Sequence, residues 1–408
     1  MGGGKVSDAP FMSVKNVATS DVRVTFSGEI YYSYDKKIWR LLSANSNLIL
    51  KVGKSVYYKN QLEPTGSSIG RFTFTGNVEL GGTPMSLIYG DDTSKYHSLK
   101  GYSTVFQRLF MYCSSIVQVE SDFLPATELE ERCYDQMFYG CRELVKTPDL
   151  PATTLAKYCY TYMFYNCEKL ATVSDLPAKI LSEYCYDNMF SYCDALEDCP
   201  KIEAEILAKS CCSEMFYGCD NIKIAPALPA TTLADSCYSR MFQYCSNLVE
   251  APELPATTLA NGCYFNMFYN CTSLIKAPDL PATTLAQNCY NSMFTSCTNL
   301  AVAQSILPAT KMEFGCYASM FSYCHALTIA PVLPATTLEG GCYSEMFQHC
   351  SKLEFVKMMA LEAPGNNTRN WLDGVASSGT FVKNSAATWN VVGVSGVPEG
   401  WTVETADA

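Results

Sequence analysis

Paired cysteines are the residues of this sequence whose type and spacing could do chemistry. The phrase C-Y-x-x-M-F-x-x-C recurs, nearly unchanged, nine times between Cys133 and Cys350, and it holds eighteen of the 21 cysteines. Such thiols could bind zinc, act in redox chemistry or form disulfides. Because C-x-x-C knuckles are lacking, we interpret both cysteine positions as small, buried apolar sites. Disulfides, chiefly through Cys199, Cys211 and Cys212, are the alternative.

Other candidate catalytic groups are few. His97, His325 and His349 are isolated histidines, and the last two lie beside repeat cysteines. A Cys/His pair can form a nucleophile, but with a cysteine in every repeat this adjacency is expected by chance. Asp91 and Asp92 could hold calcium, but turn formation is the preferred interpretation of these two aspartates. The sequence therefore predicts no enzyme, no catalytic residue, no metal site and no cofactor.

Tyrosine offers the better functional signal. The two positions after Met-Phe are not needed for a buried stripe, yet seven of the nine repeats place tyrosine there. Tyrosine gives a large contact area and a hydroxyl at low cost in rotamer entropy, which binding surfaces exploit. The rings could instead pack between neighbouring repeats. The candidate binding residues are Tyr139, Tyr165, Tyr192, Tyr217, Tyr244, Tyr269 and Tyr323.

The repeat period sets the elements that must position these side chains. Successive first cysteines are 26 residues apart, with a single step of 27 before Cys316, as in a stacked solenoid. We expect a brief strand at L-x-x-A in each repeat, ended by proline, and a helix over the Cys-to-Cys phrase. Thr257 or Thr283 would cap such a helix. In such a helix the first Cys, the Met and the second Cys would share one face. With one strand and one helix in each repeat, the expected fold is an α/β solenoid.

The variable positions beside the expected strands form a second candidate face, because solenoids often bind through the strand side. These positions are Val145, Lys146, Glu197, Asp198, Val249, Glu250, Ile275 and Lys276.

Three regions are expected along the chain. Residues 1–100 carry short runs rich in β-branched and aromatic residues, such as Val22–Phe26, and indicate a small all-β sandwich-like domain. Residues 101–357 should form about ten solenoid turns, of which 105–113 is a worn first copy. Residues 358–408 are expected to cap the last turn. The alternative for this end is a carbohydrate platform built from Trp371, Trp389 and Trp401.

Bulk composition excludes several partners. The 408 residues carry a formal charge of −11, and an acidic chain without a basic cluster is a poor ligand for nucleic acid or anionic membranes. No stretch approaches the roughly 18 to 20 apolar residues that a membrane span requires. The first ten residues lack the apolar core of a secretion signal.

The phrase Met267-Phe268-x-x-Cys271-x-x-Leu274 resembles the A-F-x-x-C-x-x-L hallmark of BspA-like leucine-rich repeat proteins of bacterial surfaces. The L-P-A-T-T-L-A variant is similar to a subgroup from gut Bacteroidales and their phages. The end of the chain, with Gly400-Trp401, resembles the tail that closes those proteins, and Met85–Asp91 gives a weaker likeness before the repeats. The resemblance implies a leucine-rich repeat solenoid with adhesive or recognition roles and without catalytic residues.

The expected function is therefore non-catalytic recognition of a cell-surface glycan or protein. The absence of a secretion signal favours a phage fibre or virion decoration component, whose N-terminal domain would dock onto other virion proteins. A bacterial cell-surface adhesin and a purely structural spacer are the alternatives. The expected location is a virion surface or a bacterial cell surface.

Overall fold

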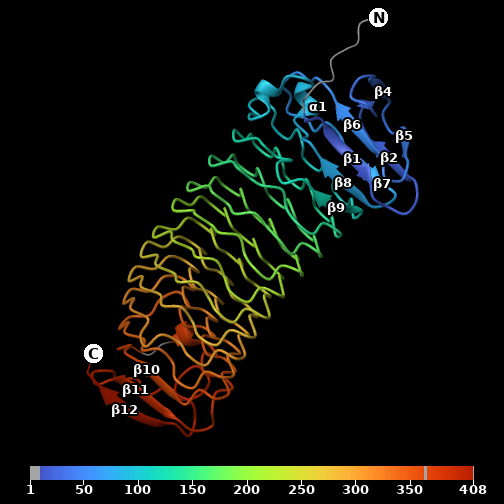
Figure 1. Ribbon diagram of the computed structural model, residues 1–408. Coiled ribbons are helices and arrows are strands. Elements are labelled where there is room, and N and C mark those ends of the chain that lie inside the picture. Colours follow the sequence, from blue (N-terminus) through green and yellow to red (C-terminus); the bar gives the residue numbers. More distant parts are fainter. Residues whose placement is uncertain (1–9, 363–364, 408) are drawn as a thin grey trace, which may run out of the picture. The chain divides into compact units, whose positions relative to one another are not determined.

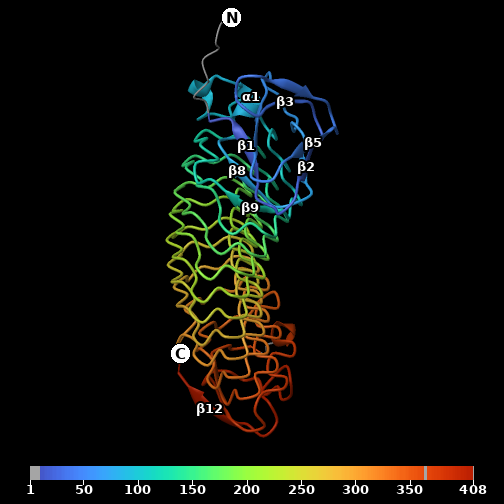
Figure 2. The ribbon, with the colours of Figure 1, turned by 45° about the vertical axis from the view of Figure 1, so that its right-hand side comes forward.

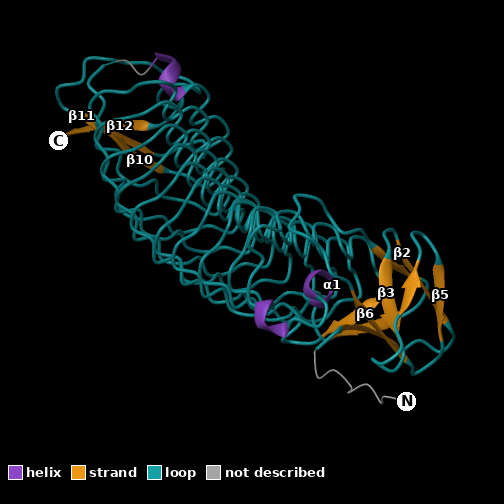
Figure 3. Cartoon of the chain, turned by 90° about the horizontal axis from the view of Figure 1, so that it is seen from above, coloured by secondary structure: helices purple, strands orange, loops and turns teal. Residues whose placement is uncertain are grey.

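Turns and short strands make up most of this chain. The computed structural model describes residues 10–362 and 365–407, which divide into two units, residues 1–202 and 203–408 (Figure 1). Helix in the described residues is limited to α1 (Ser86–Tyr89) and two 3₁₀ segments, η1 (Thr93–Lys95) and η2 (Gly365–Thr368). Figure 3 shows how little helix there is beside strands and loops. The expected α/β composition is thus wrong in its helical part.

The first unit begins with strands whose burial alternates along the chain. In β2, for example, Val22, Val24 and Phe26 are buried while the residues between them face outward. The runs rich in β-branched and aromatic residues form β2, β3, β5, β6 and β7, whereas β1, β4 and β8 were not predicted. The strands are β1 (Met12–Asn16), β2 (Val22–Phe26), β3 (Ile30–Ser33), β4 (Arg40–Leu42), β5 (Asn47–Leu50), β6 (Ser55–Lys59), β7 (Phe72–Phe74), β8 (Val78–Gly81) and β9 (Ile116–Val119).

These strands form two sheets. One has the order β4-β3-β6-β1-β8-β9 and the other the order β5-β2-β7. Tyr58 of β6 meets Phe72 of β7 with ring centroids 5.2 Å apart, so the sheets contact each other through a buried aromatic core. Strand β9 pairs in parallel with β8 and belongs to the first repeat. The predicted end of the N-terminal domain at residue 100 lies between β8 and β9, which are paired in one sheet. This domain limit remains a prediction.

Each repeat forms one coil, and its Cys-to-Cys phrase is a series of turns with positive φ at every fourth residue. In one coil these residues are Arg132, Gln136 and Gly140. The Met137 N–H donates to the carbonyl of Tyr134 within the coil, whereas the Phe138 N–H donates to Met163 of the next coil. Positive φ at the third residue is the geometry of a type II turn. The pattern occurs in four described coils of the first unit and six of the second.

The predicted helix over this phrase is therefore wrong. A left-handed residue every fourth position prevents α-helix, and half of the N–H groups bond to the neighbouring coil instead. Thr257 and Thr283 consequently cap no helix, and the next threonine of each pair forms a parallel bridge, as Thr258 does with Thr284. The predicted shared face is correct, because a period of four keeps every fourth side chain on the buried side.

Identical side chains stack in columns within each unit. Phe138 and Phe164 lie 5.5 Å apart between ring centroids and nearly parallel, and Phe268 and Phe294 repeat this arrangement in the second unit. The stacked phenylalanines are fully buried. Because one residue type fills each column, the same contact is repeated from coil to coil within each unit, as expected for repeat proteins.

The second cysteine of each phrase has a polar role. The Cys271 thiol donates to the carbonyl of Phe242 in the preceding coil, with a sulfur–oxygen distance of 3.1 Å. This carbonyl also accepts the N–H of Cys245, so the thiol supplies a second bond to it. Equivalent distances lie between 3.0 and 3.3 Å at Cys141, Cys167, Cys297, Cys324 and Cys350, all free thiols.

The second unit ends in the parallel sheet β10-β11-β12, with β10 (Phe355–Met358), β11 (Thr380–Asn384) and β12 (Thr402–Ala406) (Figure 1). Figure 2 shows β12 of this sheet near the C-terminus. Trp371, Trp389 and Trp401 are all less than 8% exposed. Each indole N–H donates to a main-chain carbonyl at 2.8 or 2.9 Å. The alternative of a tryptophan platform for carbohydrate is therefore wrong, because the ring faces are covered. The predicted cap limits at 358–408 remain a prediction.

Alkaline pH should unfold the chain through its thiols. Burial raises the pKa of Cys133 and of Cys263 to about 12, from 9.0 without burial. The unfolded chain therefore releases these protons first, so stability is complete below about pH 9 and is lost as pH rises toward 12. Thermal unfolding followed by circular dichroism across this range should show a falling midpoint. A midpoint unchanged up to about pH 12 would contradict the burial of these thiols as the cause.

Replacing one thiol should show what its hydrogen bond contributes. Cys271→Ala and Cys289→Ala remove the same volume from fully buried sites, but the Cys289 sulfur lies 4.0 Å from its carbonyl partner. Cys271→Ala should therefore be the more destabilising change, by about 0.5–1.5 kcal/mol. Urea unfolding of both variants measures the difference. Equal midpoints would mean that the thiol acts only by its volume.

Candidate functional site

The candidate tyrosines lie where the chain leaves the buried Phe column. The second position after Met-Phe has positive φ, so tyrosine at the first position is followed by Gly or Asn, as in Tyr139-Gly140 and Tyr165-Asn166. Where tyrosine takes the second position, as at Tyr192, it adopts positive φ itself, which is unusual for a bulky residue. Both arrangements turn the ring away from the buried side of the coil.

The first unit brings its candidate tyrosines together. Tyr139 and Tyr165 stack at 4.7 Å with nearly parallel rings, and Tyr165 meets Tyr192 edge-on at 5.4 Å. Tyr112 of the first coil extends the row, with its ring 5.2 Å from Tyr139. We call Tyr112, Tyr139, Tyr165 and Tyr192 the tyrosine ladder. Its rings are half-buried inside the row and exposed at Tyr112, which is 61% exposed.

The second unit has a shorter row. Tyr217 meets Tyr244 at 5.3 Å, and Tyr244 meets Tyr269 at 5.7 Å. The following coil has Thr295 and Ser296 in place of tyrosine, so Tyr323 is separated from the row. Tyr323 instead packs against His349 at 4.7 Å. The structure therefore groups six of the seven candidates, three in each unit, and leaves Tyr323 apart.

The sequence prediction missed further tyrosines of the same face. Tyr158 and Tyr184 stack at 4.8 Å, and the guanidinium of Arg132 lies 3.9 Å from the Tyr158 ring centroid. Tyr162 contacts Tyr165 at 5.5 Å. All three tyrosines occupy other left-handed positions of the four-residue pattern. If the Cys-to-Cys phrase is interpreted as turns, aligning the repeats at every fourth residue identifies these three tyrosines from the sequence.

Tyr139 is a ring of the ladder whose surroundings disfavour ionisation. Burial, followed by the nearby Tyr112, raises the pKa of Tyr139, so its hydroxyl stays protonated. Beside Tyr158, Arg132 bonds the buried carboxylate of Asp135 at 3.1 Å. The face can therefore offer aromatic contact area and hydroxyl hydrogen bonds, the features of an adaptable binding surface.

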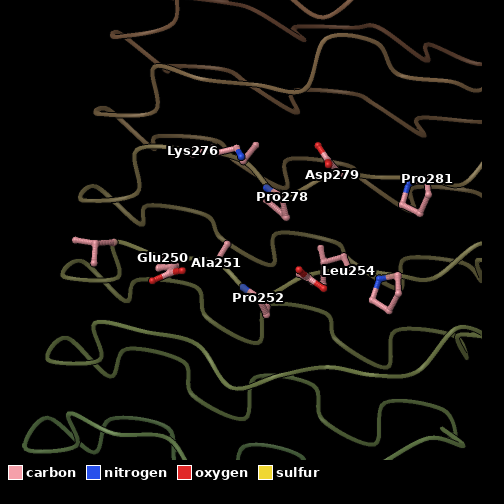
Figure 4. A pocket seen from close by; sticks show the side chains of 12 residues that line it. Glu250, Ala251, Pro252, Leu254, Lys276, Pro278, Asp279 and Pro281 are labelled. Carbon is pink, nitrogen blue, oxygen red and sulfur yellow. The ribbon is translucent and has the colours of Figure 1, made fainter.

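A second candidate surface lies on the variable strand-side positions. A cavity of about 510 Å³ opens there in the second unit, and Figure 4 shows its lining. Val249, Glu250 and Lys276 line it, as do Glu253 and Asp279 and the prolines of the A-P-x-L-P segments. A neighbouring cavity of about 400 Å³ shares Glu250 and Glu253 with it. In the first unit the equivalent positions are exposed, including Val145, Lys146, Glu197 and Asp198.

Metal and membrane binding find no support in the described residues. Within residues 10–362 and 365–407, no group of three or more His, Cys, Asp or Glu side chains could hold a metal ion. Within the same ranges, no helix is long and apolar enough to cross a membrane. The Nδ1 atom of His325 lies 2.9 Å from the main-chain carbonyl oxygen of His349. The expected absence of cofactors and of catalysis remains a prediction.

The 26-residue coils, each with a buried leucine or isoleucine, two buried cysteines and a buried phenylalanine at fixed positions, define a leucine-rich repeat protein. The family model for the BspA type leucine rich repeat region matches six copies, over residues 103–249 and 209–354. These matches span more than half of the chain. The protein belongs to the BspA-type leucine-rich repeat family, as its phrases predicted.

One solved structure with a similar chain is a leucine-rich repeat protein from Bacteroides ovatus ATCC 8483. It is 16% identical, the match covers 68% of this chain and 88% of that chain, and the TM-score is 0.23. A likeness of this size carries no argument about function. Comparison with curated proteins gave no match.

Ring contacts between coils should be energetically coupled. Tyr244 and Tyr269 lie in adjacent coils, whereas Tyr217 and Tyr269 lie two coils apart. A double-mutant cycle with Tyr→Ala changes should give a coupling free energy of about 0.5 kcal/mol for the adjacent pair. This value is at the lower end of the range for aromatic pairs, because Tyr244 is 36% exposed. The distant pair should be additive. Additivity in both pairs, measured by urea unfolding, would contradict a packed row.

Proposed function

We propose that this protein recognises a cell-surface glycan or protein without catalysis, and that the coils form a solenoid that presents the tyrosine ladder as its binding surface. The observation that carries the proposal is the row of partly exposed rings in successive coils of the first unit. A row whose members are already packed against each other loses little further rotamer entropy on binding. Family membership agrees with a binding or adhesive role.

The half-buried rings also stabilise the coils, which is the competing explanation of the row. Tyr139 stacks on Tyr165, so part of each ring face is used inside the molecule. Tyr112 is 61% exposed and Tyr192 is 38% exposed, so part of each ring is accessible to a ligand. We therefore propose that Tyr112 and Tyr192, together with Tyr158 and Tyr184, make most of the contacts.

We further propose that the protein is a phage fibre or virion decoration component located on the virion surface. Its two N-terminal sheets would form a sandwich-like domain that docks onto other virion proteins. Exposed apolar side chains support a docking role, since Ile38 is 62% exposed and Leu41 is 51% exposed on the edge strand β4 or beside it. A bacterial cell-surface adhesin would use the same binding face. Nucleic acid is not expected as a partner of either.

Truncating the ladder should weaken binding if this proposal is right. The variant Tyr112→Ser, Tyr165→Ser and Tyr192→Ser removes three rings, including the two that are most exposed, and binding to whole cells and to a glycan array should fall at least about tenfold. A matched control, Val145→Ser with Ile180→Ser, removes exposed apolar side chains that lie outside the ladder. Circular dichroism checks that both variants are folded.

Each result decides between the surfaces. Binding lost by the ladder variant and kept by the control supports the proposal. Binding lost by the control alone would move the site to the strand-side positions. Binding unchanged in both variants, or absent from the unaltered protein, would contradict a recognition role of the ladder and favour a structural spacer.

A further inference from the structure

Charge is distributed unevenly along this acidic chain. Residues 1–100 contain 12 Lys or Arg and 8 Asp or Glu, a formal charge of +4, whereas the remaining residues contain 17 and 32, a charge of −15. An anion is therefore attracted to the N-terminal strands and repelled elsewhere. The net charge of the whole sequence, −11, conceals this local excess.

A cavity of about 500 Å³ lies within this basic region. It is lined by Tyr34, Ile49, Lys51, Gly53, Lys54, Ser55 and Tyr57. Tyr34 follows β3 and Ile49 lies in β5. Lys51, Gly53 and Lys54 belong to the turn between β5 and β6, and Ser55 and Tyr57 lie in β6. Cavities of roughly 300–1,000 Å³ are typical of small-ligand sites, so this one is of suitable size for one or two sugar rings but not for a folded partner.

The lining combines apolar faces with cations. Tyr34 is 47% exposed and Ile49 is 48% exposed, although both are large side chains that a core would bury. Lys36 lies with its ammonium 4.7 Å from the ring centroid of Tyr57, which holds a third cation at the edge of the cavity. Gly53 has φ +70 and open space around it, which lets the turn place Lys51 and Lys54 on either side.

The nearby carboxylates leave part of this positive charge uncompensated. Asp21 pairs with Lys51 at 2.7 Å. The Asp35 carboxylate accepts hydrogen bonds from the backbone N–H groups of Ile38 and Lys37 in its own loop. These bonds lower the pKa of the carboxyl to about 2. Lys36, Lys37, Lys51 and Lys54 thus outnumber these two carboxylates, Asp21 and Asp35, and none of the described residues that line the cavity itself is acidic.

We propose that the cavity formed by Tyr34, Tyr57, Lys51 and Lys54 binds an acidic saccharide, a sugar that carries a carboxylate or sulfate group. The apolar face of a pyranose would lie on a tyrosine ring, and the acidic group would accept hydrogen bonds from the lysine ammonium groups. The site is separate in sequence from the tyrosine ladder and does not depend on the function proposed for it.

Titration calorimetry of the full chain with a glucuronate-containing disaccharide tests this proposal. A neutral disaccharide of glucose controls for the acidic group, and acetate controls for the sugar ring. We expect binding of the acidic disaccharide only, weakened by salt because the contact is ionic. Lys51→Gln with Lys54→Gln should weaken it about tenfold or more. Lys15→Gln, a change to another exposed and ion-paired lysine of the same region, should leave it unchanged.

A second variant separates recognition from mere folding effects. Asp21→Asn removes the carboxylate that occupies Lys51, so it should strengthen binding, which a structural role would not predict. Tyr57→Leu should weaken binding while keeping the charge. The proposal is overturned if the acidic disaccharide does not bind, if the neutral one or inorganic phosphate binds as well, or if the lysine variant binds normally. The ladder variant should bind normally, which keeps this outcome independent of the other surface.

Discussion

The structure depends on hydrogen bonds that cross from one coil to the next within each unit. Along the Cys-to-Cys phrase every second N–H donates within its own coil, and the others donate to the neighbouring coil, as the Phe138 N–H does to Met163. This alternation requires a left-handed residue at every fourth position. Gly and Asn meet that requirement cheaply, and the other residues that occupy it must be held by their contacts.

The same geometry explains the buried columns. A repeat of four places the two cysteines and the methionine on one side, and the coil spacing brings each phenylalanine over its equivalent at about 5.5 Å. The thiol of the second cysteine then donates to the carbonyl of the phenylalanine in the preceding coil, as Cys271 does to Phe242. Cysteine is thus small enough for the column and still a donor, which alanine is not.

The outer face follows from the turns rather than from the core. Left-handed positions project side chains such as Tyr158 and Tyr192 outward, where they meet their neighbours from adjacent coils. A rigid repeated scaffold can therefore carry different side chains at these positions without a change in the buried columns.

The sequence by itself determined the period, the family, the buried columns and five N-terminal strands, because these depend on apolar spacing and β-propensity. It did not decide between helix and turns, since over nine residues the periods of 3.6 and 4 place the same three residues, the two cysteines and the methionine, on one face. The hydrogen-bond partners that decide this lie 25 residues away, as between Phe138 and Met163. Likewise, only tertiary contacts buried Trp371 and gathered Lys36, Lys51 and Lys54 around one cavity.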